Sequence, residues 1–409
     1  IGDLTWSSFS LFGVTGGGAN PADPDNIISV GAYFTTTIGA GGTWSGAKLQ
    51  YFQVTAAPAL TWDGSPDTTW TGTSDATSWS GRTYDDGDAV QFLDTGAGTV
   101  SISGTVSPAS ILVDSSSDYS LGGGVIAGTA DGLTKTNSGT LTLTGANTYT
   151  GDTSVDEGTL EIGGSGKVGD YHGELSIASG AVFKYSSDQV LGAANRFDGN
   201  ISGDGSFVVD TSSGSVLFGG GTKSVAKVEV KAGRLEAQSS DSALGTAATT
   251  VHLGDTSGTA DAELKISGAT RTFTTKAGLT VEAGSSGTKT LISSSVAYTD
   301  STPITLEDDL TIENEGPLTL GGVISDSGGS FGLTLNAQDA TDTLTLSEQT
   351  KTVIYSGPTT IDHGTLILSR GANPPGPQGT VTINNGGTLA FGHFNQLSKD
   401  GSIPDVVVN

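Results

Sequence analysis

The sequence contains an internal repeat whose register is kept over two long segments. Ile111–Ile126 corresponds to Leu310–Ile324, and the continuation Thr140–Ile162 corresponds to Thr343–Leu368. The offset between equivalent residues grows only from 199 (310 minus 111) to 206 (355 minus 149), which indicates short insertions in loops. A repeat of this kind predicts stacked structural units that bury one continuous core, as in solenoid proteins.

A smaller unit recurs inside these blocks. It consists of a β-branched residue, two mostly polar residues, a glycine, and another apolar residue one or two positions later, which is typical of a strand end, a tight turn and the next strand. The steps between successive units are 22, 53, 51, 80 and 22 residues, and they predict a rung of about 22 to 27 residues. The units are Val155–Leu160, Ile177–Val182, Val230–Leu235, a weaker copy at Val281–Gly284, Ile361–Leu366 and Ile383–Leu389.

The composition favours an all-β chain. Glycine accounts for 63 of the 409 residues and the hydrophobic fraction is 34%, while Val, Ile, Leu and Thr recur in short alternating runs between glycines. Alternation with turn residues between the runs indicates strands, and the charged fraction of 15% is too modest for a typical disordered chain. With a strand spacing of about 4.8 Å, residues 80–409 would form roughly a dozen coils over a length on the order of 60 Å.

The charge balance excludes two classes of partner. Formal net charge is −26, from 43 acidic and 17 basic residues, and such a field repels both phosphate backbones and anionic lipid headgroups. We therefore expect no nucleic acid as a partner. No run approaches the length of about 18 apolar residues that spans a bilayer, and no signal-peptide pattern follows Ile1. We expect no direct membrane insertion of this chain.

The tryptophans indicate a change of architecture along the chain, because all five lie between Trp6 and Trp79. A stretch of small residues and proline at Ala56–Ala59 marks a boundary. We predict three parts. Residues 1–57 form a short β-sandwich-like segment that belongs to a larger or incomplete sandwich, 58–110 form a Trp-containing cap with the first rungs, and 111–409 form the repeat-built β-helix.

The repeat closely resembles the autotransporter-associated β-strand repeat, also called the passenger-associated transport repeat. The first copy carries the features of that family in Leu133–Leu143, Asn147–Gly151 and Gly158–Leu160. The second copy lacks the lysine and the Asn-Thr-Tyr start but keeps Tyr355 and Gly364–Leu366. The resemblance covers roughly residues 61–392, and the first copy is a specific match.

The resemblance implies a right-handed parallel β-helix passenger that is exported by a Gram-negative-type bacterium. Such a passenger is displayed at the cell surface or released from it, and it normally precedes an anchor or a sorting tail. The chain ends at Asp405–Asn409 in what looks like a rung cut partway, so we expect a fragment or a processed form. The extracellular location is an expectation that rests on this resemblance.

Two enzymatic interpretations compete with structural ones. Asp326–Gly329 matches the nucleophile motif of chymotrypsin-like proteases, but Ser325 stands where that family has glycine, so we interpret the segment as a turn. A polysaccharide lyase or a glycosidase is the serious alternative, because parallel β-helices host both and glycoside hydrolysis needs only paired carboxylates. Lyases of this fold also need clustered basic residues, and the five arginines are scattered singly. We expect no enzymatic activity.

Metal and cofactor sites are not predicted. The acidic turns Asp23–Asn26 and Asp85–Asp88 could supply oxygen ligands to Ca²⁺, but neither follows a known Ca²⁺-binding loop, so we interpret them as solvated turns. The four histidines are far apart and share no ligand spacing.

Three tryptophans are the candidate contact residues. Trp62, Trp70 and Trp79 could present flat faces to a surface glycan, or they could seal the first rung as a hydrophobic cap, and we favour the cap. The apolar tail Val406–Val408 could pair with another copy head to tail and build a filament. The sequence thus predicts a structural or adhesive surface rod, with a glycan-binding module or a glycan-cleaving enzyme as alternatives.

Overall fold

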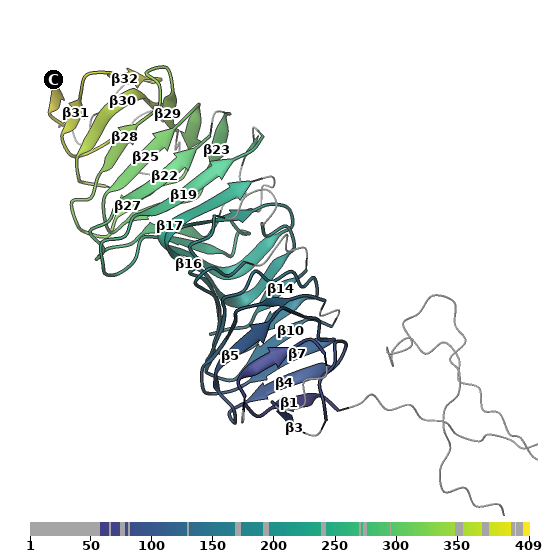
Figure 1. Ribbon diagram of the computed structural model, residues 1–409. Helices are drawn as coiled ribbons and strands as arrows, with labels where there is room; N and C mark the ends of the chain where they lie inside the picture. Colours follow the sequence, from purple (N-terminus) through teal and green to yellow (C-terminus); the bar gives the residue numbers. More distant parts are fainter. Residues whose placement is uncertain are drawn as a thin grey trace, which may run out of the picture. The chain divides into compact units, whose positions relative to one another are not determined.

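A computed structural model describes most of the chain after residue 57 (Figure 1). The predicted segment 1–57 and the acidic turn Asp23–Asn26 lie outside the described residues. The described residues are 58–64, 67–73, 78–80, 82–128, 131–167, 173–190, 196–238, 243–269, 271–272, 276–294, 296–347, 355–369, 376–393, 397 and 404–409.

The described part is an all-β parallel solenoid of about 12 coils, as predicted. It contains no helix, and so none that could cross a membrane. Apart from the two-residue strand Trp79–Ser80, the strands pair in parallel with strands of the neighbouring coils: Leu133, for example, pairs with Ile111 and with Thr153. The coils differ in length, since one runs from Leu133 to its partner Thr153 and a longer one runs from Leu60 to its partner Val90.

Alternation between buried and partly exposed residues explains the strands. In Leu133–Thr136 and Thr140–Leu143 every second side chain points into the coil, where Leu133, Leu141 and Leu143 are at most 1% exposed. Because successive Cβ atoms of a strand lie on opposite faces, one apolar residue in two suffices to fill the interior. The inward residues of successive coils stack on one another and form one continuous core.

The coils have three sides in the N-terminal half. The first side consists of β1 (Leu60–Trp62), β4 (Ala89–Leu93), β7 (Ser110–Asp114), β10 (Leu133–Thr136), β12 (Thr153–Val155) and β14 (Leu175–Ile177). The second side consists of β2 (Thr69–Thr71), β5 (Gly98–Ser103), β8 (Tyr119–Gly122), β11 (Thr140–Leu143), β13 (Thr159–Ile162) and β15 (Val182–Tyr185). On the third side lie the short strands β6 (Thr105–Val106) and β9 (Val125–Ile126), and β3 (Trp79–Ser80) pairs antiparallel with β1.

Two long strands in the middle of the chain run along all three sides. β16 (Ile201–Phe218) and β17 (Lys223–Gln238) pair with each other from end to end, with register shifts at the corners. Their first residues continue the first side, their middle residues the second side, and their last residues the third side.

The C-terminal half continues these columns. The second side runs on through β18 (Thr250–Leu253), β21 (Gly278–Val281), β24 (Ile304–Leu306) and β27 (Ile324–Asp326). The third side runs on through β19 (Ala262–Ser267), β22 (Lys289–Ser293), β25 (Leu310–Asn314), β28 (Leu333–Asn336), β30 (Thr359–Leu368), β31 (Val381–Ile383) and β33 (Val406–Val408), which form successive layers in Figure 1. A further column holds β20 (Arg271–Thr272), β23 (Tyr298–Asp300), β26 (Leu318–Leu320), β29 (Thr343–Leu346), the end of β30, and β32 (Gly387–Phe391).

The two copies of the sequence repeat lie on different sides of the solenoid. Leu133 of the first copy belongs to the first side, whereas its counterpart Leu333 belongs to the third side. Leu141 belongs to the second side, whereas Leu344 belongs to the further column that begins with β20. The offset between the two copies is therefore not a whole number of coils, and the same local sequence faces a different direction in each copy.

The interior contacts of the two copies are nevertheless alike. The Tyr149 hydroxyl lies 3.5 Å from Thr153 Oγ1, and the equivalent Tyr355 hydroxyl lies 2.8 Å from Thr359 Oγ1. Gly158 adopts φ 68° in its turn, and a Cβ there would lie 2.5 Å from main-chain oxygens of the preceding coil. Such a close approach between coils explains why glycine occupies the turn position of the repeat.

We expect the inward and outward positions of one strand to respond differently to truncation. Leu141→Ala should lower the free energy of unfolding by about 2 to 5 kcal/mol, because it leaves a cavity in the stacked core. The adjacent outward residue provides the control, and Thr142→Ala should change it by about 0.5 kcal/mol or less. Urea unfolding followed by circular dichroism measures both, and equal losses would contradict the assigned register.

Candidate functional site: a double loop and the groove beside it

The three candidate tryptophans lie inside the N-terminal end of the solenoid. Trp62, Trp70 and Trp79 are only 1%, 0% and 5% exposed. Their ring centroids are 5.1 to 5.4 Å apart with steep interplanar angles, and the rings also pack against Tyr84 and Phe92. Edge-to-face contacts of this kind stabilise a core beyond the area that they bury. No face of these three rings is available for stacking on a sugar.

The outer edge of the first strand is also occupied. β3 pairs antiparallel with β1, with Thr61 opposite Ser80 and Trp62 opposite Trp79. An unpaired strand edge offers free N–H and C=O groups to other chains. At β1, another strand of the same chain takes these groups.

Carboxylates of the acidic turn Asp85–Asp88 accept hydrogen bonds from other residues of the same chain. Arg82 donates to both carboxylate oxygens of Asp88 at 2.6 and 2.7 Å, and Asp86 Oδ1 accepts from the Tyr84 hydroxyl at 3.1 Å and from Ser107 N at 2.7 Å. Among the described residues, no group of three or more acidic or histidine side chains is arranged to hold a metal ion.

The protease-like segment Asp326–Gly329 forms a turn between coils. Asp326 Oδ2 accepts from Ser356 N at 2.6 Å and from Ser356 Oγ at 2.8 Å, and Ser327 N donates to Leu306 O. The Asp326 carboxylate thus holds the following coil, and the N–H of Ser327 adds a main-chain hydrogen bond to the preceding coil.

Carboxylates recur in this capping role along the whole solenoid. In each case a side chain at the start of one strand or turn accepts a main-chain N–H of the following coil, at 2.7 to 2.8 Å. The pairs are Asp94 with Ser116, Asp118 with Thr140, Asp152 with Glu174, Asp198 with Gly220, Asp261 with Thr288 and Asp309 with Gly332. These six aspartates therefore satisfy main-chain donors at coil corners, which would otherwise lose hydrogen bonds.

Two neighbouring corners between the second and third sides carry longer loops than those around them. Residues 254–261 connect β18 to β19 in eight residues, and 282–288 connect β21 to β22 in seven. The corners on either side are shorter, with two residues at 231–232 and three at 307–309. We call the pair 254–261 and 282–288 the double loop.

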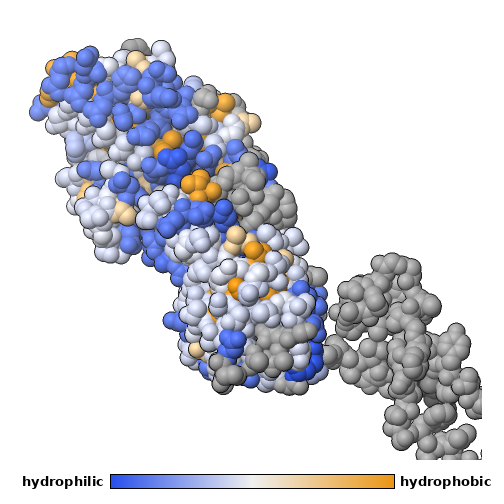
Figure 2. Space-filling view, in the orientation of Figure 1, coloured by the Kyte–Doolittle hydropathy of each residue, from blue (hydrophilic) through white to orange (hydrophobic). Residues whose placement is uncertain are grey.

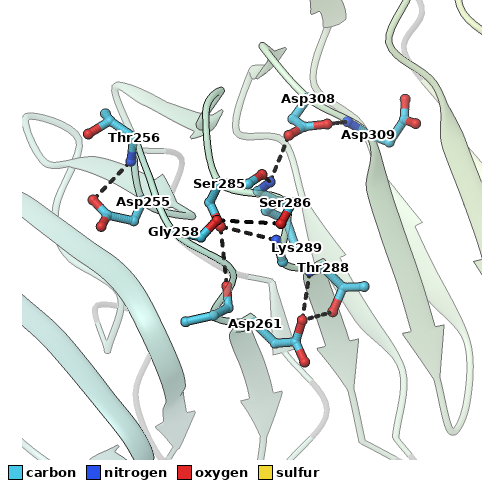
Figure 3. Close-up of polar contacts among 12 residues, drawn as sticks. Asp255, Thr256, Gly258, Asp261, Ser285, Ser286, Thr288, Lys289, Asp308 and Asp309 are labelled. Carbon is cyan, nitrogen blue, oxygen red and sulfur yellow. Dashed lines mark hydrogen bonds and ion pairs between the residues drawn. The ribbon is translucent and has the colours of Figure 1, made fainter.

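Main-chain contacts join the two layers of the double loop (Figure 3). Ser285 N donates to Asp255 O at 3.1 Å, and Ser286 N donates to Gly258 O at 3.0 Å. A Cβ on Gly287 would lie 1.9 Å from Ala260 O, so the layers are in contact at a position that only glycine allows. The double loop is therefore an ordered part of the solenoid that projects from a corner, and residues 256–261 are exposed.

Two side chains fix the ends of the double loop. Asp261 Oδ1 accepts from Thr288 N at 2.7 Å and from Thr288 Oγ1 at 2.8 Å, and these hydrogen bonds hold the pKa of Asp261 below its usual value. Lys289, whose side chain is 3% exposed, donates from Nζ to Ser285 O at 2.5 Å and lies 2.7 Å from Asp308 Oδ2. A buried ammonium group with both a carboxylate and a carbonyl partner is well satisfied.

A groove of about 680 Å³ lies beside the double loop. One wall is Thr211–Ser215, where β16 bulges past Gly233 of β17. The other wall is Thr259–Asp261 of the double loop, and the short turn that ends at Gly233 and Arg234 lies between them. Gly233 adopts φ 78°, and a Cβ there would lie 2.6 Å from Thr211 Cγ2. Only glycine therefore allows the turn to lie this close to Thr211.

The lining of the groove mixes polar and apolar groups. Arg234 Nε and Nη2 both lie 2.5 Å from Glu263 Oε2, and both side chains are partly exposed. Ser212 and Ser213 are exposed on the opposite wall. Among the described lining residues none is aromatic, and the large exposed apolar side chain is that of Val190. The groove thus offers hydroxyl, carboxylate and guanidinium groups for hydrogen bonding and one exposed valine for apolar contact.

Sequence reasoning did not predict this site. The only signal for the double loop is the polar, glycine-containing stretch Asp255–Asp261, which resembles many other turns of the chain. The groove depends on the differing lengths of three successive corners, and these corners become neighbours only when the coils are stacked.

The fold defines a β-solenoid repeat protein whose regular core carries loops of differing length at its corners. The chain carries two matches to the passenger-associated-transport-repeat, at residues 133–162 and 341–368, as the sequence features predicted. It therefore contains passenger-associated transport repeats and resembles the passengers of autotransporter adhesins.

One curated relative extends this resemblance. Over 120 residues the chain is 36% identical to a protein named "Adhesin BmaC autotransporter" from Brucella suis biovar 1 (strain 1330). The aligned part covers 29% of this chain and 3% of that protein. No solved structure gave a significant match.

The capping carboxylates predict a pH dependence of stability. The pKa of Asp94, Asp261 and Asp326 is lowered in the folded state. Hydrogen bonds from Ser116 and Thr288 cause this at Asp94 and Asp261, whereas at Asp326 burial raises the pKa and hydrogen bonds, those from Ser356 foremost, outweigh it. Their contribution is full above the unfolded pKa of about 3.9 and is lost as the pH falls through the lowered folded values. We expect the melting temperature to fall between about pH 5 and pH 3.

Asp261→Asn tests one of these caps. The amide keeps an acceptor oxygen for Thr288 but does not titrate in this range, so its melting temperature should fall less between those two pH values. Differential scanning calorimetry measures the slope. An unchanged slope in the variant would show that Asp261 does not contribute.

Lys289 should control the order of the double loop. Lys289→Met keeps the apolar stem and removes the contacts to Ser285 O and Asp308, so amide protons of 285–288 should exchange at least about tenfold faster. Lys265→Met, on the partly exposed face of the neighbouring strand β19, is the matched control. Hydrogen exchange measured by mass spectrometry compares the two variants. Equal exchange rates at 285–288 in both would show that Lys289 does not order the double loop.

Proposed function

We propose that this chain is a shaft segment of a bacterial surface adhesin, and that its role is adhesive and structural rather than catalytic. The observation that carries the proposal is the double loop, which projects from an otherwise regular solenoid whose sequence resembles part of an adhesin autotransporter. A solenoid supplies reach, because each coil adds about 4.8 Å, and the corner loops supply contact residues without disturbing the core. The resemblance to an autotransporter adhesin supports a surface-exposed or secreted location.

The surface suits a soluble shaft that makes polar contacts. On the face shown in Figure 2 most of the coloured residues range from intermediate to hydrophilic, and hydrophobic residues occur in small scattered groups. Larger contiguous apolar patches usually mark obligate protein interfaces. The net charge of −26 further favours solubility and mutual repulsion of neighbouring shafts.

The described arginines support a non-catalytic role. Arg82, Arg196 and Arg234 each form an ion pair with a carboxylate, and each lies on a different coil. A lyase on this fold would need such cations directed at the anion that develops during elimination. Head-to-tail assembly through Val406–Val408 stays a prediction, although β3 already covers the outer edge of β1.

Bead adhesion tests the adhesive role. Beads that carry the full chain should bind at least one surface in a panel of epithelial cells, matrix proteins and immobilised glycans more than beads with an equally acidic albumin. A variant in which 254–261 and 282–288 are each replaced by Lys-Ala-Gly, the sequence of the chain's own short corner and the glycine that follows it at 231–233, should lose most of this binding. Binding at the albumin level on every surface, or product release from a polysaccharide panel, would sink the proposal.

A further inference from the structure

We infer that the groove between Thr211–Ser215 and Thr259–Asp261 binds a short neutral oligosaccharide. The inference rests on the proposed adhesive function and names the ligand class of that site. It also moves the glycan contact away from Trp62, Trp70 and Trp79, which are buried at the end of the solenoid.

The dimensions of the groove suit a few sugar rings. Its volume of about 680 Å³ lies within the range of about 300 to 1,000 Å³ that is usual for small-ligand sites. The walls come from coils on both sides of the short corner at Gly233, and each wall leads directly into a paired strand residue, Ser215 on one side and Ala262 on the other. A site whose walls are fixed by the scaffold loses little entropy when a ligand binds.

The lining groups match the hydrogen-bonding pattern of sugars. A sugar hydroxyl both donates and accepts, and it needs partners of both kinds. Carboxylates of Asp261 and Glu263 accept, the guanidinium of Arg234 donates, and the serine hydroxyls of Ser212 and Ser213 do either. Hydrogen bonds to ionised groups are about twice as strong as those between neutral groups, so Asp261 and Arg234 would contribute most.

The charges of the groove favour a neutral ligand over a charged one. Glu263 already neutralises Arg234 at 2.5 Å, so a carboxylated sugar would have to displace it. Asp261 already accepts two hydrogen bonds from Thr288, so a cationic peptide would meet a carboxylate that is partly satisfied. The net charge of −26 repels anionic polymers as a whole.

The lack of aromatic residues sets the expected strength. Tight binding usually depends on large side chains, aromatic ones above all, in well-packed pockets, whereas this lining has no aromatic residue and its large apolar side chain, Val190, is exposed. A handful of solvent-exposed hydrogen bonds gives a Kd on the order of 1 mM for one site. Many chains on one cell surface would raise the overall avidity through simultaneous contacts.

The test compares two tryptophan variants of the double loop. Ala260→Trp places an indole in the wall of the groove, whereas Ala283→Trp places the same indole on the other layer, which does not line it, and both alanines are exposed. Binding of maltotriose, cellotriose and triacetylchitotriose to the full chain is measured by saturation-transfer NMR and calorimetry. We expect at least one trisaccharide to bind, Ala260→Trp to weaken it at least tenfold, and Ala283→Trp to leave it within twofold.

Several results would overturn the ligand assignment. These are no trisaccharide binding up to 10 times the expected Kd of about 1 mM, equal binding by both variants, or stronger binding of trigalacturonate or pentalysine than of any neutral sugar. The bead assay separates this failure from that of the proposed function. If beads with the Ala260→Trp chain still adhere fully, the adhesive function stands and the groove is not its binding site. If beads with the unmodified chain do not adhere, the adhesive function itself is contradicted.

Discussion

Parallel main-chain pairing between successive coils is the interaction on which the rest of this structure depends. Each strand offers one edge to the coil before it and one to the coil after it, and the inward side chains stack in the same register. In such an arrangement stability is close to a sum of terms between neighbouring coils. The aspartate caps and the contact between Lys289 and Asp308 each act across one such step.

The pairing between coils explains the role of the capping aspartates. A parallel coil leaves main-chain donors at its corners, and aspartates such as Asp118 and Asp152 accept them from the following coil. The converse problem, unpaired carbonyl groups at corners, is met by buried lysines. Lys223 donates to Gly199 O at 2.9 Å and also to Gly220 O, and its burial lowers its pKa to about 8.

Uniform coils would leave a smooth surface with nothing to distinguish one region from another. The corners of this chain differ in length, and each difference is tolerated because a corner loop lies outside the core. The double loop and the adjacent groove arise because successive corners differ in length. The short corner at 231–232 is followed, one coil later, by the first of the two longer loops. Recognition can therefore vary along the solenoid while the core stays the same.

The sequence by itself determined the fold class, the approximate coil length and the family resemblance. These follow from local patterns, namely alternation within strands such as Thr140–Leu143, glycines at turns such as Gly158, and the register of the repeat. Local patterns suffice because each strand needs only its own alternation to present one face to the interior.

The tertiary structure alone decided which residues meet. It placed Leu133 and its counterpart Leu333 on different sides, and it enclosed Trp70 among Trp79, Tyr84 and Phe92. It also brought Thr211–Ser215 opposite the double loop. The physical reason is that the length of every intervening coil and corner sets the position of the next one. A difference of a few residues in one corner thus changes which residues meet at the surface, while the alternation of buried and exposed residues within the strands stays the same.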